Sequence, residues 1–290
     1  MSSPRPLLIL GAARSGTKVL RRLLGAAPGA AVVPYGVPAV WKQGNENCPH
    51  DALPRSACSP ATARRIRTEL RGLAQGPSDA SLLVEKTSAN TLRVPFVHAV
   101  FPNARVVHLV RDGVDVVESA RRRWQARPGL GYLVRKALYL RETGLRQGLR
   151  YLWRRLRGVG SSAPSLWGPH YPGMADDVTE RPLLAVCAQQ WRTCVQYTLE
   201  ALDALPDKQV LSLRYETLVR EPKSVDRLAR FAGVPDATPM HAVYRQEVDD
   251  AFVGRGRTRL TAAERETLAP ILQTPLEQLG YPPVASGRSR

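Results

Sequence analysis

The stretch LLILGAARSGTKVL, residues 7–20, predicts a strand, a tight turn and a helix in immediate succession. Its apolar run ends at Gly11, and Gly16 leads into an amphipathic segment. Such a turn presents several backbone N–H groups to an anion at the positive end of a helix dipole. The two glycines allow the backbone to approach the anion closely. Polar side chains of the same turn add charge and hydroxyl donors: Arg14, Ser15 and Thr17.

The order of residues differs from that of the nucleotide-binding P-loop, in which Gly-Lys-Ser/Thr follows four variable positions. Here Thr17 precedes Lys18, so the hydroxyl residue and the lysine have exchanged places. A P-loop nucleotide kinase is an alternative that this order disfavours, as does the lack of a clear acidic residue for Mg²⁺ after an apolar strand. The loop is expected to hold a phosphate other than the β- and γ-phosphates of ATP.

Short apolar runs alternate with amphipathic stretches along the chain. The runs are residues 7–10, 31–33, 82–85, 106–110 and 210–213. The amphipathic stretches are residues 18–25, 63–73, 91–101, 114–124 and 183–205. This alternation predicts a P-loop-like α/β fold of three layers, with helices on both faces of a central parallel sheet of about five strands. Ligands of such sheets bind at the carboxyl ends of the strands, where residues 11–17, Lys86 and Arg111 fall.

Length and composition limit the classes of protein to which this chain can belong. A chain of 290 residues is long enough for a single α/β domain, residues 1–290, with a full core. The formal net charge is +17, and only six of the 42 basic residues are lysine. This charge either favours anionic partners or reflects an arginine-rich composition alone, and both interpretations stay open. No stretch reaches the ~18 apolar residues of a membrane span and no signal-like segment opens the chain, so a soluble, cytoplasmic protein is expected.

The four cysteines predict neither a disulfide framework nor a metal site. Cys187 and Cys194 are seven residues apart in a helical pattern and are expected in the core. Cys48 and Cys58 flank a proline-containing loop and could pair, although thiols of a cytosolic chain are expected to stay reduced.

A basic, loosely amphipathic segment begins at Leu133 and leads into a stretch rich in proline and glycine. It predicts an inserted helical cap over residues 133–180. The polar face of this cap is either simply solvated, or it forms a substrate lid or a patch that contacts an anionic membrane. Near the C-terminus, TAAE at residues 261–264 is a capping box that starts a last helix, and residues 281–290 are expected to form a disordered tail.

A second motif, VVHLVRDGVDVVESARRRW, covers residues 106–124. Arg111 follows the apolar run, and Asp112 can cap the next helix. Ser119 is eight residues beyond Arg111, about two helical turns at ~1.5 Å per residue. Its hydroxyl can therefore face an anion that Arg111 grips with two parallel hydrogen bonds. The alternative is that Arg111 pairs with Asp112 or Asp115 and that Ser119 is a surface residue.

Together the two segments resemble the sulfotransferases that use 3′-phosphoadenylyl sulfate (PAPS), particularly bacterial members related to the Golgi and tyrosylprotein enzymes. GAARSGTKVL is similar to the 5′-phosphosulfate loop of that family, and RDGVDVVES to its 3′-phosphate motif, with Gly113 where proline is usual. The segment VEKTSANTLRVPFVHAVFPNARVVHLVRD has the order expected between them, and VLSLRYETLVREP is similar to the R-Y-E-D-L segment. The resemblance spans residues 5–260.

The resemblance implies transfer of a sulfuryl group from PAPS to a hydroxyl or amine of a carbohydrate, lipid or secondary metabolite. It implies no metal, no specific nucleic acid and a small-molecule, glycan or lipid acceptor. The residues implied for the 5′ group are Arg14, Ser15, Gly16, Thr17 and Lys18. Those implied for the remainder of the donor are Arg111 and Ser119 at the 3′-phosphate, Tyr215 near adenine, and Arg255 and Arg257 as a basic clamp. Gly256 stands where relatives often have an aromatic residue.

Lys86 matches the lysine that follows the third strand in the family, where it would stabilise the leaving phosphate. The general base is harder to identify. Relatives use a histidine near that lysine, where this chain has Ser88, or a glutamate after the second strand, where VVPYGVPAVW has no carboxylate. The adjacent loop, residues 41–51, supplies Glu46 and His50 as the predicted candidates, with Asp51 beside them. A non-catalytic nucleotide- or polyanion-binding protein therefore stays open as an alternative, against which Lys86 argues.

Overall fold

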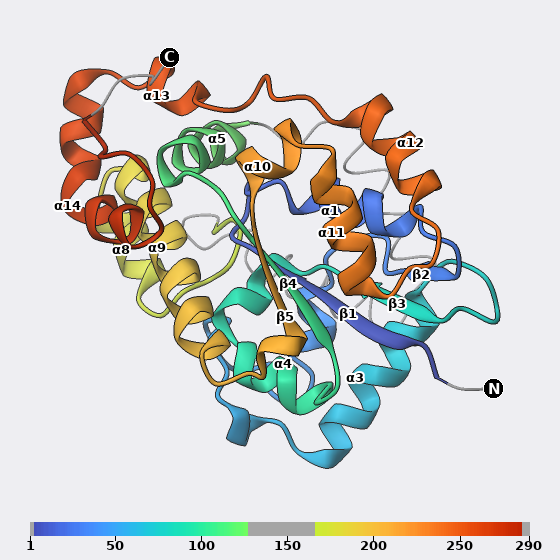
Figure 1. The fold of residues 1–290 in the computed structure, drawn as a ribbon. Helices are drawn as coiled ribbons and strands as arrows, with labels where there is room; N and C mark the ends of the chain where they lie inside the picture. Colours follow the sequence, from blue (N-terminus) through green and yellow to red (C-terminus); the bar gives the residue numbers. More distant parts are fainter. Residues whose placement is uncertain (1–2, 127–165, 286–290) are drawn as a thin grey trace.

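The computed structural model describes residues 3–126 and 166–285. At its centre is a parallel sheet with the strand order β2-β3-β1-β4-β5 (Figure 1). The strands are β1 (Arg5–Leu10), β2 (Ala30–Val32), β3 (Leu82–Glu85), β4 (Arg105–Val110) and β5 (Val210–Arg214). All five predicted strands are confirmed, each to within one or two residues at its ends.

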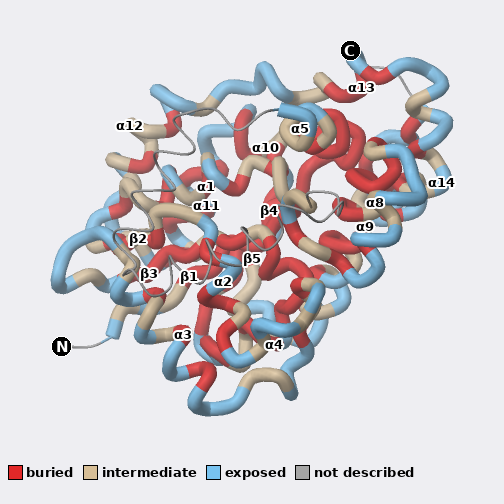
Figure 2. The backbone as a smooth tube through the Cα atoms, turned by 180° about the vertical axis from the view of Figure 1, so that it is seen from behind, coloured by how far each residue is buried: buried red, intermediate tan, exposed pale blue. Residues whose placement is uncertain are grey.

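Helices cover both faces of the sheet because alternate residues of each strand point to opposite sides. Leu7 and Ile9 of β1 are buried on one face, under α1 (Thr17–Gly25), α10 (Tyr215–Arg220), α11 (Lys223–Ala232) and α12 (Thr238–Glu247). Leu8 is buried on the other face, beneath α2 (Pro38–Trp41), α3 (Pro60–Leu73) and α4 (Val94–Val100). Figure 2 shows these strands as buried chain enclosed by more exposed helices. The predicted three-layer α/β fold is confirmed.

A third group of helices gathers at the left of Figure 1. It consists of α5 (Gly113–Gln125), α8 (Met174–Glu180), α9 (Leu183–Leu202), α13 (Arg255–Arg259) and α14 (Ala262–Gln278). Cys187 and Cys194 are buried in this group, as predicted, beside Trp191. Short 3₁₀ turns lie elsewhere: η1 (Arg55–Ala57), η2 (Ser88–Leu92) and η3 (Asp207–Gln209).

The ends of several helices follow the local signals. The Asp112 carboxylate accepts a hydrogen bond from the Val114 amide at the start of α5 (2.9 Å), and Thr261 and Glu264 form the expected capping box of α14. The helix predicted for residues 91–101 begins later, at Val94. Pro95 is the second residue of α4, in the first turn, where its missing N–H costs no helical hydrogen bond; a helix starting at residue 91 would place it in the interior. Helix α11 was not predicted, although Val225, Leu228 and Ala232 have helical spacing.

Two predictions concern the C-terminal tail and the inserted cap. The first needs correction, and most of the second falls outside the described residues. The expected tail begins too early, because Tyr281 and Val284 are buried against α14 and the Tyr281 hydroxyl donates to Glu216 (2.8 Å). Of the predicted cap over residues 133–180, residues 133–165 lie outside the described part, and residues 166–173 form an irregular segment before α8.

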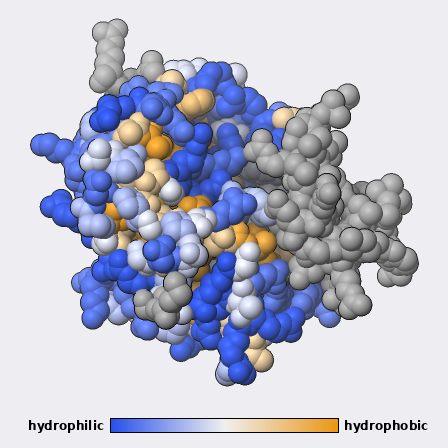
Figure 3. All heavy atoms as spheres, turned by 90° about the vertical axis from the view of Figure 1, so that its right-hand side faces the viewer, coloured by the Kyte–Doolittle hydropathy of each residue, from blue (hydrophilic) through white to orange (hydrophobic). Residues whose placement is uncertain are grey.

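The cysteines of the described ranges are all free thiols, so Cys48 and Cys58 do not pair. None of the helices in residues 3–126 and 166–285 has both the length and the apolar character needed to cross a membrane. The face in Figure 3 is mostly hydrophilic, with hydrophobic residues gathered near its centre. Among the described residues, the large hydrophobic side chains that are exposed are Tyr197 and Phe252.

Candidate functional site

The loop between β1 and α1 contains two residues with left-handed backbone. Gly16 is left-handed, with φ of 90°, and Arg14 is also left-handed, with φ of 76°. A Cβ atom at Gly11 would lie 2.7 Å from the Leu109 carbonyl oxygen, so a side chain has no room there. Left-handed backbone at a non-glycine residue costs about 1–3 kcal/mol and is concentrated at functional sites. The conformation of Arg14 therefore supports the loop as a binding site.

The end of β5 closes over this loop. A Cβ atom at Gly16 would lie 2.3 Å from the ring of Tyr215, the first residue of α10. The Arg111 guanidinium lies over the same Tyr215 ring, with Cζ 4.4 Å from the ring centroid, which is a cation–π geometry. Burial raises the pKa of the Tyr215 phenol, so this group stays neutral at physiological pH. The structure thus brings Gly16, Arg111 and Tyr215 together.

Arg111 is buried at the carboxyl end of β4 and is held by three groups. Its Nη1 donates to the Arg14 carbonyl (3.1 Å), and its Nη2 donates to the Phe252 carbonyl (2.6 Å). Nη2 also lies 3.6 Å from Oδ2 of Asp115, so the ion pair considered from the sequence is formed. Its Nε is buried without a hydrogen-bond partner. One donor of a buried guanidinium is therefore left for an anion.

A direct hydrogen bond joins the two sequence motifs. Nε of Arg14 donates to Oγ of Ser119 on α5 (2.9 Å), across 105 residues of sequence. Ser119 is buried and is not the surface residue of the alternative interpretation. Burial lowers the pKa of Arg14, and the nearby charges of Arg111, Arg122 and Arg123 lower it further. Several cations therefore gather around Arg14, which favours an anionic ligand.

The predicted C-terminal clamp is divided between two places. The Asp115 carboxylate accepts hydrogen bonds from the amides of Gly254 (2.7 Å) and Gly256 (2.6 Å), which holds this turn beside the site. Arg255 is partly exposed there, with Cζ 5.3 Å from the Phe252 ring centroid. A Cβ atom at Gly256 would lie 2.4 Å from the Val114 carbonyl oxygen, which explains why no aromatic residue stands at this position.

Arg257 lies in a different environment from Arg255. Its Nε contacts Oδ2 of Asp112 (2.7 Å), and its two terminal nitrogens donate to the carbonyls of Pro282 (2.8 Å) and Pro283 (2.7 Å). These contacts tie the C-terminal segment to the start of α5. A role for Arg257 as a ligand clamp is not supported by this geometry.

Lys86 directly follows β3 and is partly buried. Its Nζ donates to Oγ of Ser88 (3.1 Å). Ser88 occupies the position at which the family that the sequence resembles can have a histidine. Burial lowers the pKa of Lys86 to about 8, and the positive charges of Arg21, Lys18 and Arg14 act in the same direction. A second group of cations thus lies at the carboxyl end of β3, the strand next to β1.

The candidate bases lie on the loop after α2. Glu46 is exposed, and Nδ1 of His50 is 3.5 Å from Sγ of Cys48. Asp51 is buried with Arg93 and accepts a hydrogen bond from the His170 amide (2.8 Å), so it is not available to a substrate. The structure tests neither Glu46 nor His50 as the base.

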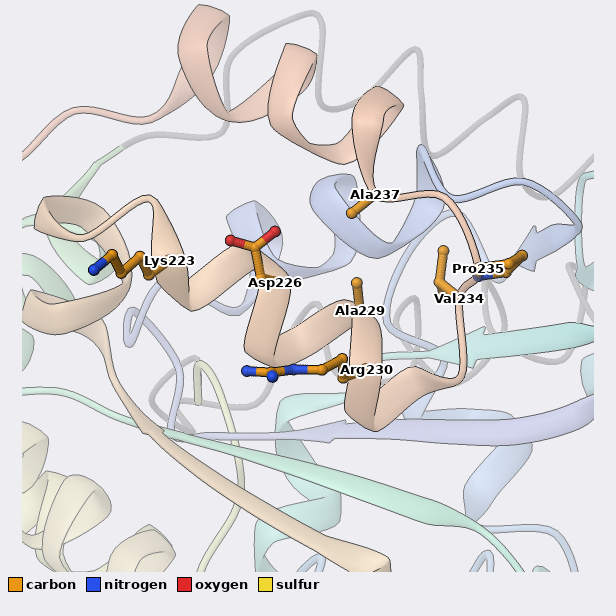
Figure 4. A pocket seen from close by; sticks show the side chains of 7 residues that line it. All are labelled: Lys223, Asp226, Ala229, Arg230, Val234, Pro235 and Ala237. Carbon is orange, nitrogen blue, oxygen red and sulfur yellow. The ribbon is translucent and has the colours of Figure 1, made fainter.

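Sequence reasoning missed Asp115 and the Phe252 carbonyl as parts of the site. Asp115 belongs to the quoted motif and was considered only as a partner of Arg111. A backbone carbonyl leaves no signal in the sequence, because every residue carries one. A groove of about 520 Å³ lies elsewhere (Figure 4). All its lining residues come from α11 and the turn before α12, and none belongs to the motifs discussed above.

Comparisons with known proteins found a matching family model and several similar folds. Residues 6–147 match the model of the sulfotransferase family. The sulfotransferase domain from the curacin biosynthetic pathway is 18% identical with a TM-score of 0.53, over 98% of this chain and 100% of that domain. Sulfotransferase STF9 from Mycobacterium avium is 16% identical with a TM-score of 0.55, over 99% of this chain and 79% of that one.

A mammalian structure is also similar. Mouse sulfotransferase SULT7A1, solved in complex with PAP, is 12% identical with a TM-score of 0.50, over 95% of this chain and 86% of that one. At such identities the structural likeness shows a shared fold. No protein of curated function matches the chain by sequence.

Proposed function

We propose that this chain, of which residues 6–147 match the model of the sulfotransferase family, transfers a sulfuryl group from PAPS to a hydroxyl or amine of a small molecule, glycan or lipid. The main support for this proposal is the contact between the two sequence motifs, residues 7–20 and 106–124. Arg14 donates to Ser119, and Arg111 donates to the Arg14 carbonyl, so one ligand can touch both motifs at once.

The residues present fit the donor. The loop amides with Arg14, Ser15, Thr17 and Lys18 would hold the 5′-phosphosulfate at the start of α1. Arg111 and Ser119 would hold the 3′-phosphate, and the buried, unpartnered Nε of Arg111 supports this assignment. Tyr215 would lie near the adenine. Arg255, partly exposed on the turn that Asp115 holds, is the remaining cation proposed for this end of the donor.

Sulfuryl transfer requires alignment and charge stabilisation more than covalent participation by the protein. PAPS supplies the sulfuryl group, whose bond to the 5′-phosphate oxygen breaks as a bond to the acceptor oxygen or nitrogen forms. Lys86 and Arg14 stabilise the charge that develops on the leaving phosphate. The acceptor proton passes to a general base, for which we propose Glu46 or His50.

The activity is tested by incubating the protein with PAPS and a panel of hydroxyl and amine acceptors. We expect formation of adenosine 3′,5′-bisphosphate together with a sulfated product, with and without a chelator, because the donor is held by cations of the protein. ATP turnover that stops with a chelator and returns with Mg²⁺ would support the kinase alternative. Tight bisphosphate binding without turnover of any acceptor would support the non-catalytic alternative.

Binding of adenosine 3′,5′-bisphosphate is expected to weaken as the pH rises above 8. The pKa of Lys86 is lowered to about 8, so its positive charge is present below this pH and is lost above it. An anion that binds the charged form loses up to about tenfold in affinity per pH unit in this range. The phosphates themselves are already ionised, since their second pKa is about 6.

Calorimetry at about pH 7 and about pH 9 would measure this loss, and the number of protons taken up on binding would identify its source. The variant Lys86→Met should show a nearly constant affinity over the same range. Equal pH dependence in the wild type and the variant would assign the effect to another group.

Replacing the candidate bases is expected to affect turnover much more than donor binding. A general base contributes about 10²–10⁴-fold to the rate. One of the variants Glu46→Gln and His50→Ala should lose kcat on this scale, while its affinity for the bisphosphate stays within about twofold of the wild type. Both variants with wild-type kcat would show that the base lies outside these two residues.

A further inference from the structure

A chain of buried polar groups connects the turn that carries Lys86 with the acceptor loop, which we define as residues 42–51. Oε1 of Glu85 accepts a hydrogen bond from the Thr87 hydroxyl (2.6 Å), and Oε2 accepts one from the Asn90 amide (3.2 Å). Oδ1 of Asn90 in turn accepts from Nε of Arg93 (2.9 Å). Nη1 of Arg93 lies 3.6 Å from Oδ1 of Asp51, the last residue of the loop.

Further contacts of this chain hold the loop and its neighbours. Asp51 forms two backbone-directed hydrogen bonds with His170: its carboxylate accepts from the His170 amide (2.8 Å), and its own amide donates to the His170 carbonyl (2.7 Å). Lys42 donates to the Cys48 carbonyl (2.7 Å), and its Nζ is 4.0 Å from Asp51. Thr87 accepts a hydrogen bond from the Val37 amide (2.8 Å). Three separate segments therefore meet around the Lys86 turn.

The burial of these groups argues against a role in stability alone. Arg93 is 0% exposed and Asp51 is 5% exposed. Burial lowers the pKa of Arg93 to about 10, against the opposing charges of Asp51 and Glu85. A buried ion pair is often no more stabilising than apolar residues of the same size. The Nη1 and Nη2 atoms of Arg93 also have no hydrogen-bond partner in the structure, which adds to the cost of burying them.

We propose that Arg93 and Asp51 are positioning residues that hold the acceptor loop in a fixed place relative to Lys86. Arg93 reaches the Lys86 turn through Asn90 and Glu85, and it reaches the loop through Asp51. The acceptor hydroxyl must meet the donor in line, and a displacement of about 1 Å can cost about 100-fold in rate. The pair thus sets acceptor use without touching the donor. The positioning role rests on the proposed function. The contacts among Glu85, Asn90, Arg93 and Asp51 do not depend on that function.

The test compares five variants with the wild type, the fifth being Arg93→Lys. Arg93→Met leaves the Asp51 charge buried without its partner, Asp51→Asn removes the opposite charge, and the double variant removes both. Arg67→Met is the control, because Arg67 donates to the Val100 carbonyl (2.8 Å) on the neighbouring helix and belongs to none of the contacts between Glu85 and Asp51 described above. For each protein we would measure the melting temperature, bisphosphate affinity, amide hydrogen exchange of residues 42–51, and kcat and KM for the best acceptor of the panel.

We expect Arg93→Met to lose stability, because the buried Asp51 carboxylate loses its guanidinium partner and keeps only the more distant Lys42 charge, and the double variant to regain much of it. The double variant should nevertheless keep faster exchange in residues 42–51 and a kcat/KM for the acceptor at least about tenfold below the wild type. Its affinity for the bisphosphate should stay within about twofold. Arg93→Lys keeps the charge without the fork and should restore acceptor use only in part.

Two results would overturn the positioning role. One is a double variant whose loop exchange and acceptor KM are those of the wild type. The other is a loss of bisphosphate affinity as large as the loss of acceptor use, which would indicate a general structural defect. If the wild type turns over no acceptor, the proposed function fails, and the exchange of residues 42–51 relative to residues 14–20 still decides whether Arg93 and Asp51 hold the loop.

Discussion

Replacing Lys86 by methionine is expected to lower kcat by about 10²–10³-fold, the effect of removing one donor that stabilises developing charge in a transition state. The side chain follows β3 and shares its environment with Arg14, Lys18 and Arg21, so it lies where the leaving phosphate would gain charge. Methionine has a similar length and adds no polar group. The loss should therefore report the missing charge and not a collapsed site. Steady-state kinetics with PAPS and the best acceptor would measure it.

The control for this variant is Lys208→Met, which changes an exposed lysine on η3. It should leave kcat unchanged. The bisphosphate affinity of Lys86→Met at neutral pH should fall by less than about tenfold, because most of the contribution of Lys86 arises in the transition state. A variant that keeps wild-type kcat, or loses affinity and kcat to the same degree, would contradict the proposed role.

Replacing Arg111 by alanine should weaken binding of adenosine 3′,5′-bisphosphate by at least about tenfold, since a charge-assisted hydrogen bond contributes about 1.5–3 kcal/mol and 1.4 kcal/mol is one decade. Adenosine 5′-monophosphate lacks the 3′-phosphate, so its weaker binding should change little. Arg111 also holds the Arg14 carbonyl, and a small loss common to both ligands is therefore expected. The informative quantity is the ratio of the two losses.

Arg14→Ala is the matched comparison, because both ligands carry a 5′-phosphate and should lose affinity alike. Four dissociation constants measured by calorimetry at one fixed salt concentration complete the test. Equal losses for both ligands in Arg111→Ala would show that Arg111 does not read the 3′-phosphate. The assignment of the two motifs to one PAPS molecule would then lose its main support.

Most of the fold follows from signals that lie close together in the sequence. Each apolar run of three to five residues became a strand or most of one, and the glycine-rich turn at residues 11–16 became the β1–α1 loop. The caps at Asp112 and Thr261 also began helices as predicted. These signals are readable because strand formation, glycine backbone freedom and capping depend on neighbours within a few residues.

For a related reason, the sequence identified only some of the residues of the candidate site. The motifs identified Arg14, Arg111 and Ser119, and the parallel sheet placed them at one edge. Arg255 and Arg257 look equivalent in the sequence, two residues apart, and both were expected at the donor. Only Arg255 stays at the turn beside the site, because Arg257 is engaged by Asp112 and by two carbonyls of the C-terminal segment.

By itself, the sequence determined the strands, the glycine-rich turn after β1, the capped starts of α5 and α14, and the chemical type of the candidate site residues. The tertiary structure alone decided which distant groups meet: Tyr215 against Gly16, the Phe252 carbonyl on Arg111, and Asp51 beside Arg93. Hydrophobic periodicity tells which face of an element is buried, but it does not identify the element that covers it. That choice depends on the strand order β2-β3-β1-β4-β5 and its long crossovers, which bring together residues as far apart as Arg111 and Phe252.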